Sequence, residues 1–236
     1  NQFQTAVDGS AQRAHYYSYT GGGTPAVGTC YADNKYTKVS VPSTSAQAQN
    51  FANWYSYYST RLLLMKTAAG RAFKSINDNY RVGYSTIGYS GTNSSDSNFL
   101  KIADFNTTQK TTWYSKLYGA SATHWTPLRA ALSKAGRIYA GKLLTGADDP
   151  VQYSCQQNFT LLTTDGDWKS DNETPSYGPF QVNGATNVGN QDGTAEKPMK
   201  DGLNKSDTLA DVSMYYYQTD LRNPTLGNCT GALGAG

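Results

Sequence analysis

The clearest pattern along the chain is a helical repeat of large apolar and small residues within residues 51–76. Its members stand three or four positions apart: Phe51, Trp54, Tyr55, Tyr58, Leu62, Met65, Ala69, Ala72, Phe73 and Ile76. Steps of three and four match the 3.6-residue period of an α-helix. The pattern therefore predicts one long helix, kinked near Gly70, whose apolar face packs on a sheet.

Shorter stretches of apolar and β-branched residues predict strands between the helices. Such stretches occupy residues 36–41, 81–87, 99–105 and 157–164, and turn-forming residues bound most of them. The first belongs to a Tyr- and Gly-rich arm or insertion, residues 1–44. The other three fall within residues 45–236, which we expect to form the folded core.

Three further helices are predicted in the core. Residues 107–118 form the first, and Thr126-Pro127 starts the second, because a hydroxyl can cap a helix and proline needs no N–H at the first helical position. Ser206 is the expected cap of the third, which follows a long polar loop at residues 169–205. The alternation of helices and strands predicts an α/β fold with a largely parallel sheet.

Residues 157–168 are the stretch around which we expect the core to be organised. The predicted strand ends in an acidic turn, because Asp165-Gly166 breaks it. Ligands of open parallel sheets bind at the carboxyl ends of the strands, so Asp165 is a candidate ligand or catalytic group. The alternative is that Asp165 only shapes the turn, since Asp-Gly is a common turn pair.

Composition indicates a secreted protein with a neutral surface. Asp, Glu, Lys and Arg make up 16% of the chain, against an ordinary level of about 25%. The net charge of +3 is scattered, and 19 tyrosines and 23 glycines stand beside many Ser, Thr and Asn residues. Neither a nucleic-acid partner nor an anionic membrane is expected. The sequence also lacks an apolar run of about 20 residues, so no membrane span is predicted.

The three cysteines, Cys30, Cys155 and Cys229, are disulfide candidates. They allow three single bridges and leave one thiol over, and the sequence does not choose among these pairings. None lies in a Cys-x-x-Cys or Cys/His cluster, so a zinc site is not expected. A bridge formed in an oxidising compartment is the favoured interpretation.

Four separated segments carry a resemblance to a known family. They are NFANWYSYY at 50–58, TPLR at 126–129, CQQNFTLLTTDG at 155–166 and DTLADVSMYY at 207–216. In order and spacing they resemble the amino-terminal part of the PilC/PilY family of type IV pilus tip adhesins, over roughly residues 45–222. Residues 1–44 are similar to the variable insertion after that family's first strand.

The resemblance implies a von Willebrand factor A-like fold, which is Rossmann-like and doubly wound, with helices on both faces of a largely parallel sheet. It also implies Mg²⁺ or Ca²⁺ held by an Asp-x-Ser-x-Ser motif, a Thr and an Asp. Thr126 stands at the second of these positions and Asp165 at the third, and both offer the oxygen ligands that these ions take. The nearest string to the first part is residues 8–12, with Gln12 in place of the second Ser.

We assign residues 8–12 to the insertion. The fold is therefore expected to lack its first strand and its last strands, and the metal site is expected to be incomplete within this chain. In that case the hydroxyl of Thr126 serves only as a helix cap.

The resemblance implies a non-enzymatic adhesion and assembly module at the tip of a type IV pilus. Such a protein is exported through the periplasm and outer membrane to the cell surface. Its expected partners are minor pilins of the tip complex and a host-cell, matrix or abiotic surface. Asp167, Trp168 and Tyr177 are the candidate binding residues.

Two alternatives stay open. One is a purely structural scaffold that docks minor pilins. The other is a secreted hydrolase acting on glycans, with His124 beside Asp165. The sequence contains no Gly-x-Ser-x-Gly elbow, and its only glutamates are Glu173 and Glu196. Because a glycosidase needs two acidic groups across a cleft, no enzyme activity is expected.

Overall fold

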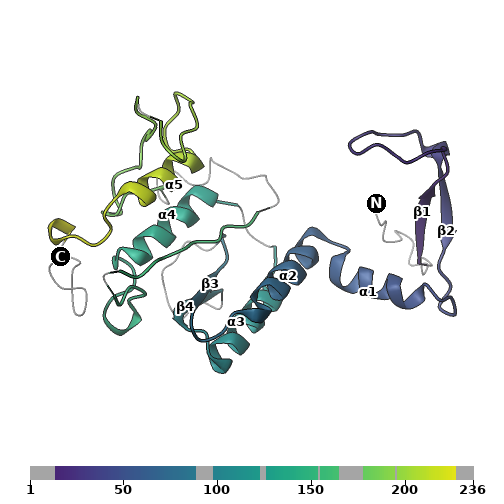
Figure 1. The fold of residues 1–236 in the computed structure, drawn as a ribbon, viewed down its shortest axis with the longest axis horizontal. Coiled ribbons are helices and arrows are strands. Elements are labelled where there is room, and N and C mark those ends of the chain that lie inside the picture. The colour runs from purple at the N-terminus through teal and green to yellow at the C-terminus, as the bar shows by residue number, and fades with distance from the viewer. Residues whose placement is uncertain are drawn as a thin grey trace. The chain divides into compact units, whose positions relative to one another are not determined.

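The structure, a computed structural model, describes residues 14–88, 98–122, 126–153, 155–164, 178–194 and 196–226. The chain divides into two compact units, Asn1–Ala68 and Ala69–Gly236, which can be followed by colour in Figure 1. The domain boundary drawn from the sequence after residue 44 stays a prediction. No helix of the described ranges is long and apolar enough to cross a membrane.

The first unit contains a tyrosine-rich hairpin. Strands β1 (His15–Tyr19) and β2 (Tyr36–Ser40) pair antiparallel, and a short 3₁₀ helix, η1 (Asp33–Lys35), leads into β2. The Tyr19 ring lies 5.0 Å from the Tyr31 ring and 5.6 Å from the Tyr36 ring, measured between centroids. The predicted strand at residues 36–41 is thus confirmed as β2.

Two helices replace the single long helix expected from the apolar repeat. They are α1 (Ala48–Tyr58) and α2 (Arg61–Ala72), and the 3₁₀ helix η2 (Phe73–Ser75) follows directly. The break falls at Ser59-Thr60 and not at Gly70. The Thr60 side chain accepts a hydrogen bond from the Leu63 N–H, and hydroxyl residues that bind the backbone in this way favour a new helix start over continuation.

The aromatic face of the first helix is not buried by the described residues of its own unit, and its packing on a sheet stays a prediction. None of the residues of α1 is buried, and Tyr55, Tyr57 and Tyr58 are exposed. A repeat of 3.6 residues indicates one face of a helix, but it does not say what that face contacts.

The second unit contains an antiparallel strand pair, β3 (Arg81–Ser85) and β4 (Phe99–Asp104). Both strands are confirmed close to their predicted bounds. The register shifts between Val82 and Tyr84, and a Cβ atom on the intervening Gly83 would come within 2.8 Å of the Leu100 carbonyl oxygen. Glycine therefore permits the close backbone approach that the irregularity requires.

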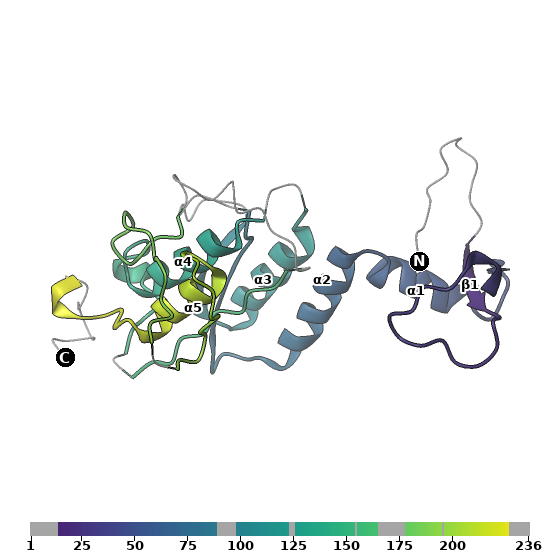
Figure 2. The ribbon, with the colours of Figure 1, turned by 90° about the horizontal axis from the view of Figure 1, so that it is seen from above.

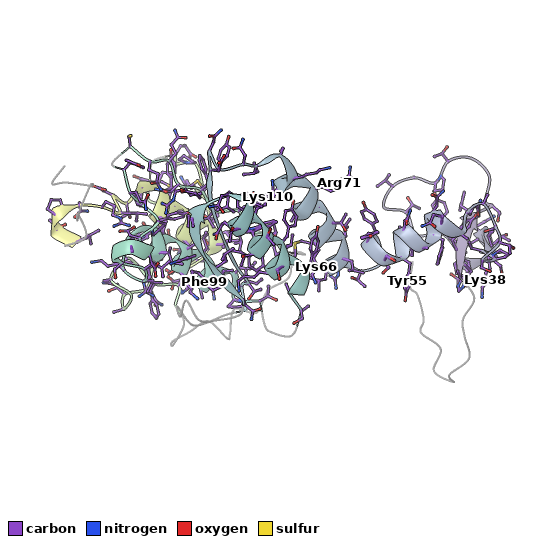
Figure 3. All side chains as sticks on the ribbon, turned by 90° about the horizontal axis from the view of Figure 1, so that it is seen from below. Lys38, Tyr55, Lys66, Arg71, Phe99 and Lys110 are labelled. Atoms are coloured by element: carbon purple, nitrogen blue, oxygen red, sulfur yellow. The ribbon has the colours of Figure 1, made fainter. Side chains whose placement is uncertain are left out.

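Helix α3 (Thr107–Gly119) covers this strand pair and confirms another prediction. Asn106 caps it by accepting a hydrogen bond from the Gln109 N–H at 3.0 Å. Trp113 and Leu117 are buried, and the Trp113 ring stacks on Phe73 with centroids 4.5 Å apart. These aromatic contacts form the core of this part of the unit. Figure 3 labels Phe99 of β4 and Lys110 of α3 among the side chains of the second unit.

Helices α4 (Leu128–Tyr139) and α5 (Leu209–Gln218) lie side by side in both Figure 1 and Figure 2. Short 3₁₀ helices, η3 (Gly146–Asp148) and η5 (Pro224–Leu226), follow them in the chain. The contact is close at Gly136, where a Cβ atom would come within 2.1 Å of the Tyr216 ring. The absence of a side chain at this position thus brings the two helices together.

The cap of α5 is Thr208 and not the predicted Ser206. Its side chain accepts a hydrogen bond from the Asp211 N–H, and the Asp211 side chain accepts one from the Thr208 N–H. This reciprocal pair is a capping box. The sequence contains this Thr-x-x-Asp pattern at residues 208–211. Two reciprocal hydrogen bonds stabilise a helix start at Thr208, which explains why Ser206 is not the cap.

The strand predicted at residues 157–164 is not formed. Residues 156–164 make no helix, strand, turn or bend, and Phe159 and Leu161 are 78% and 74% exposed. A strand needs a neighbour to satisfy its backbone groups, and the described residues supply none here. Both sheets of the described ranges are two-stranded and antiparallel, so the von Willebrand factor A-like parallel sheet stays a prediction.

Candidate functional site

Thr126, a predicted metal ligand, is half-buried immediately before α4. The helix begins at Leu128 with Pro127 as its N-cap residue, and no side chain caps it. The alternative role of Thr126 as a helix cap is therefore wrong. The helix starts one residue later than expected, which puts the threonine one position outside the cap.

The other predicted site residues lie outside the described residues. These are the second metal ligand, Asp165, and the candidate binding residues Asp167, Trp168 and Tyr177, as well as His124. Their arrangement around Thr126 stays a prediction. Across the described ranges, no three His, Cys, Asp or Glu side chains form a group that could hold a metal ion.

Two of the three cysteines, Cys30 and Cys155, lie in the described ranges. Both are exposed, and they form no disulfide with each other. Cys229 lies outside the described residues. The two pairings that involve Cys229 stay predictions.

An acidic cluster organises the polar loop before α5. Buried Asp211 accepts hydrogen bonds from the Gln191 N–H at 2.6 Å and the Thr208 N–H at 2.9 Å. Buried Asp192 accepts one from the Asp201 N–H at 3.2 Å. Because these carboxylates already receive donors from the loop itself, the geometry indicates loop fixation more than cation binding.

Asp201 is a third carboxylate of this cluster, and its hydrogen bonds change its pKa. Its side chain accepts hydrogen bonds from the Thr208 hydroxyl at 2.6 Å and the Leu203 N–H at 2.8 Å. These bonds, with that to Thr208 the largest contribution, lower the pKa of Asp201, because they stabilise its charged form. The long loop is therefore ordered near α5 by charge-assisted hydrogen bonds.

Asp207 anchors the same loop from an unusual backbone conformation. Its φ of 63° lies in the left-handed region, which Asp tolerates better than most residues. Its carboxylate accepts a hydrogen bond from the Gly189 N–H at 2.7 Å, and its carbonyl accepts one from Arg129 of α4 at 2.8 Å. The sequence carried no signal for this link, since it joins residues 78 positions apart.

A second junction joins α4, α5 and Phe180 of the polar loop. The Phe180 carbonyl accepts hydrogen bonds from the Ser133 and Tyr216 hydroxyls, each at 2.6 Å. Burial raises the pKa of Tyr216 well above its usual value. The phenol therefore stays protonated and keeps donating to this carbonyl across the physiological pH range.

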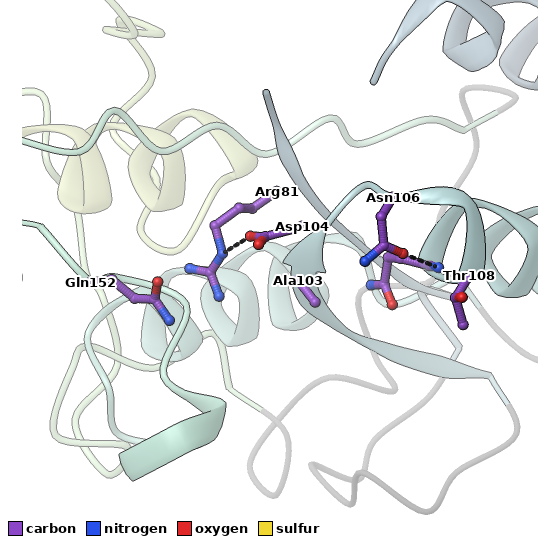
Figure 4. A pocket seen from close by; sticks show the side chains of 7 residues that line it. Arg81, Ala103, Asp104, Asn106, Thr108 and Gln152 are labelled. Carbon is purple, nitrogen blue, oxygen red and sulfur yellow. Dashed lines mark hydrogen bonds and ion pairs between the residues drawn. The ribbon is translucent and has the colours of Figure 1, made fainter. Parts of the chain in front are cut away.

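The polar cleft in Figure 4 lies where β3 begins and β4 ends, and has a volume of ≈ 340 Å³. The Arg81 Nε atom lies 3.3 Å from the Asp104 carboxylate, and Arg81 Nη1 donates to the Pro150 carbonyl at 2.6 Å. The lining residues are Arg81, Ala103, Asp104, Asn106, Thr108, Gln109 and Gln152.

This cleft has the chemistry of a structural junction. Asp104 is the one carboxylate among its lining residues, whereas glycoside hydrolysis uses a pair of them. The Arg81 guanidinium links β3 to the turn at Pro150 through a hydrogen bond. The cleft therefore offers polar contacts but lacks the acid–base pair that a hydrolase needs.

Comparison with curated proteins decides the family. Over 233 residues the chain is 32% identical to a protein of Pseudomonas aeruginosa strain PAK, "Type IV pilus biogenesis factor PilY1", covering 93% of this chain. It is 34% identical over 227 residues to the protein of the same name from strain UCBPP-PA14, covering 92% of this chain. The chain belongs to the PilC/PilY family.

The match covers only part of these relatives. The chain spans 19% of the strain PAK protein and 18% of the strain UCBPP-PA14 protein. No protein-family model matches the chain. No solved structure matches it either.

Proposed function

We propose that this chain is a non-enzymatic adhesion and assembly module of a type IV pilus tip protein. It supports pilus biogenesis and binds host or abiotic surfaces, and it works outside the cell at the pilus tip after export through the periplasm and outer membrane. The observation that carries the proposal is the identity to pilus biogenesis factors along at least nine-tenths of the chain.

Surface chemistry supports a binding role. Exposed large side chains include Tyr17, Tyr57, Tyr153, Phe159 and Tyr217, and charged residues make up only 16% of the chain. Tyrosines supply large contact areas with a polar end at low cost in conformational entropy. Minor pilins of the tip complex and a host-cell or matrix surface are the proposed partners, and the alternative is a scaffold that docks minor pilins alone.

We also propose a divalent-metal-dependent site at the start of α4. Thr126 fits such a role, because it is half-buried and lies outside the cap of the helix, and Asp165 would add a carboxylate oxygen of the kind that Mg²⁺ and Ca²⁺ prefer. A bound ion would supply a fixed positive charge for an acidic ligand group. With two ligands in the chain, Mg²⁺ or Ca²⁺ should bind to it weakly or not at all.

The binding proposal is tested with the purified chain. Pull-down of minor pilins is measured beside binding to host cells, matrix proteins and an abiotic surface. Binding to a surface as well as to pilins supports the adhesion module, binding to pilins alone supports the scaffold, and binding to neither contradicts both. Turnover on a panel of glycans and esters that is lost in Asp165→Ala or His124→Ala would instead support a hydrolase.

The metal proposal is tested by titration calorimetry with Mg²⁺ and with Ca²⁺. Weak or undetectable binding to the isolated chain is expected. Tight binding that disappears in Asp165→Ala would show that the chain holds a complete site and would contradict the assignment of ligands outside it.

A further inference from the structure

The cleft of ≈ 340 Å³ where β3 begins and β4 ends is lined almost entirely by polar side chains. Arg81 comes from β3, Asp104 from the end of β4 and Gln152 from the segment after η3, and the start of α3 supplies the rest of the polar lining. In the view of Figure 4, Gln152 lies on one side of the Arg81–Asp104 pair, and Asn106 and Thr108 lie on the other. Polar groups from several elements therefore converge on one concave space, as they do in binding sites for small molecules.

Part of this lining is already fixed by hydrogen bonds within the fold. The Gln109 side-chain amide donates to the Val82 and Lys101 carbonyls, each at 2.8 Å. Asn106 Oδ1 accepts a hydrogen bond from the Gln109 N–H at 3.0 Å. These bonds hold the side chains in place before a ligand arrives, and a preorganised site loses less conformational freedom on binding.

Other polar atoms of the lining have no hydrogen-bond partner within the described ranges. They are the Thr108 hydroxyl, the Gln152 side-chain amide, Asn106 Nδ2 and Gln109 Oε1. The set combines donors with acceptors, because an amide offers both and a hydroxyl is both at once. A sugar hydroxyl likewise donates and accepts, so these atoms match the chemistry of a saccharide.

The charge and the lining of the cleft disfavour other classes of ligand. Arg81 Nε and the Asp104 carboxylate lie 3.3 Å apart and offset each other's charge, so the cleft presents no excess positive charge to a phosphate or a nucleic acid. Ala103 is the one apolar residue of the lining, whereas an extended peptide needs pockets for its side chains. We propose that this cleft binds a neutral saccharide through its hydroxyl groups.

A saccharide ligand deepens the proposed adhesion function and rests on it, because glycans coat host cells and matrix proteins. Asp104 is the one carboxylate of the lining, so the cleft binds the sugar without hydrolysing it. Polar contacts of this kind hold a single monosaccharide weakly, with a Kd of about 1 mM.

Saturation-transfer difference NMR detects binding in this affinity range and is applied to the full-length protein. The neutral probes are glucose, galactose, mannose, N-acetylglucosamine and N-acetylgalactosamine. N-acetylneuraminic acid and glucuronic acid are the anionic probes, and triglycine is the peptide probe. At least one neutral sugar should receive saturation from the protein. Transfer to none of them, or only to the anionic or peptide probes, would overturn the proposal.

Thr108→Val and Gln152→Ala remove cleft groups that the fold does not use. Each should weaken sugar binding by about fivefold or more, while the melting temperature stays within about 2 °C of the parent value. Thr111→Val is the matched control, because Thr111 belongs to the same helix but not to the cleft lining, and its hydroxyl donates to the Thr107 carbonyl. Unchanged sugar binding in both cleft variants would place the sugar elsewhere and contradict the proposal.

Adhesion assays separate a failure of the saccharide site from a failure of the proposed function. Strains carrying either cleft variant should adhere to host cells less than the Thr111→Val strain, and the bound sugar added in solution should reduce adhesion of the parent strain. Cleft variants that lose sugar binding but adhere as the control does would overturn the saccharide site and leave the adhesion function intact. Adhesion that is unaffected by removal of residues 1–236 would instead contradict the adhesion function on which the site rests.

Discussion

The hydroxyl oxygens of Ser133 and Tyr216 lie 3.3 Å apart and donate to the same carbonyl oxygen, that of Phe180. The Phe180 N–H in turn donates to Ser133 Oγ at 2.9 Å. One pair of hydroxyls thus joins α4, α5 and Phe180 of the polar loop in a single junction. Buried groups that satisfy one another in this way are costly to disrupt.

Ser133→Ala and Tyr216→Phe should each lower the free energy of unfolding by about 1–2 kcal/mol, because each removes a donor from a partly buried carbonyl. The double variant should lose more than the sum, since each single variant leaves the Phe180 carbonyl one hydroxyl donor and only the double variant leaves it with neither. Chemical denaturation of the four proteins measures this coupling. Ser213→Ala is the control, because Ser213 donates only within α5, to the Leu209 carbonyl; strict additivity at Ser133 and Tyr216 would contradict a shared junction.

Gly136→Ala should destabilise the second unit by about 1–3 kcal/mol, because the new methyl group overlaps the Tyr216 ring. Gly119→Ala is a matched control, since a Cβ atom there meets nothing within 4 Å. It should change stability by less than about 1 kcal/mol. Equal thermal stability of the two variants would argue against close packing of α4 on α5.

The ion pair between Arg222 and Asp149 should contribute more than the exposed pairs. Arg222 donates to both Asp149 carboxylate oxygens, at 2.8 and 2.5 Å, and the two side chains are 12% and 13% exposed. Arg222→Ala should cost about 3 kcal/mol, since it leaves a shielded carboxylate unpaired. Lys200→Ala, at a pair whose Glu196 side chain is 92% exposed, should cost at most about 0.5 kcal/mol in the same denaturation experiment.

Acid should loosen the polar loop through Asp201. The pKa of Asp201 in the folded protein lies below its ordinary value of 3.8, so its contribution to stability is present above that value and is lost as the pH falls through the lowered pKa. Protonation removes the charge that holds the Leu203 N–H. The protection of the Leu203 amide against hydrogen exchange, corrected for the intrinsic pH dependence of exchange, should therefore fall at low pH. Asp201→Asn should remove this fall, and an unchanged pH profile in that variant would contradict the mechanism.

The sequence predicted local elements better than their partners. Strands β3 and β4 were predicted from stretches of apolar and β-branched residues, and helix α3 was predicted to within one residue of its end. The 3.6-residue repeat joined α1 and α2 into one helix, because periodicity carries no information about the Thr60 side chain that ends the repeat. The spacing of apolar residues thus predicts which face of a helix is apolar. Where the helix ends depends on side chains that form hydrogen bonds with the backbone, such as that of Thr60.

The contacts that organise the second unit were less accessible to prediction. Ser133, Gly136 and Asp207 act on residues dozens of positions away, and their types are common in turns and helix surfaces. Residues 157–164 show the opposite case, since β-propensity is present but no partner strand lies within the described residues. Strand formation depends on pairing as well as on composition.

The most direct test of the proposed function is made in the bacterium that carries this protein. The gene is replaced by a version lacking only the segment that encodes residues 1–236, with export and abundance of the shortened protein checked by immunoblot. Surface pili recovered by shearing, and adhesion to host cells and abiotic surfaces, are then counted against the parent strain. The account predicts a marked loss of pili, adhesion or both, whereas parental levels of both would contradict it.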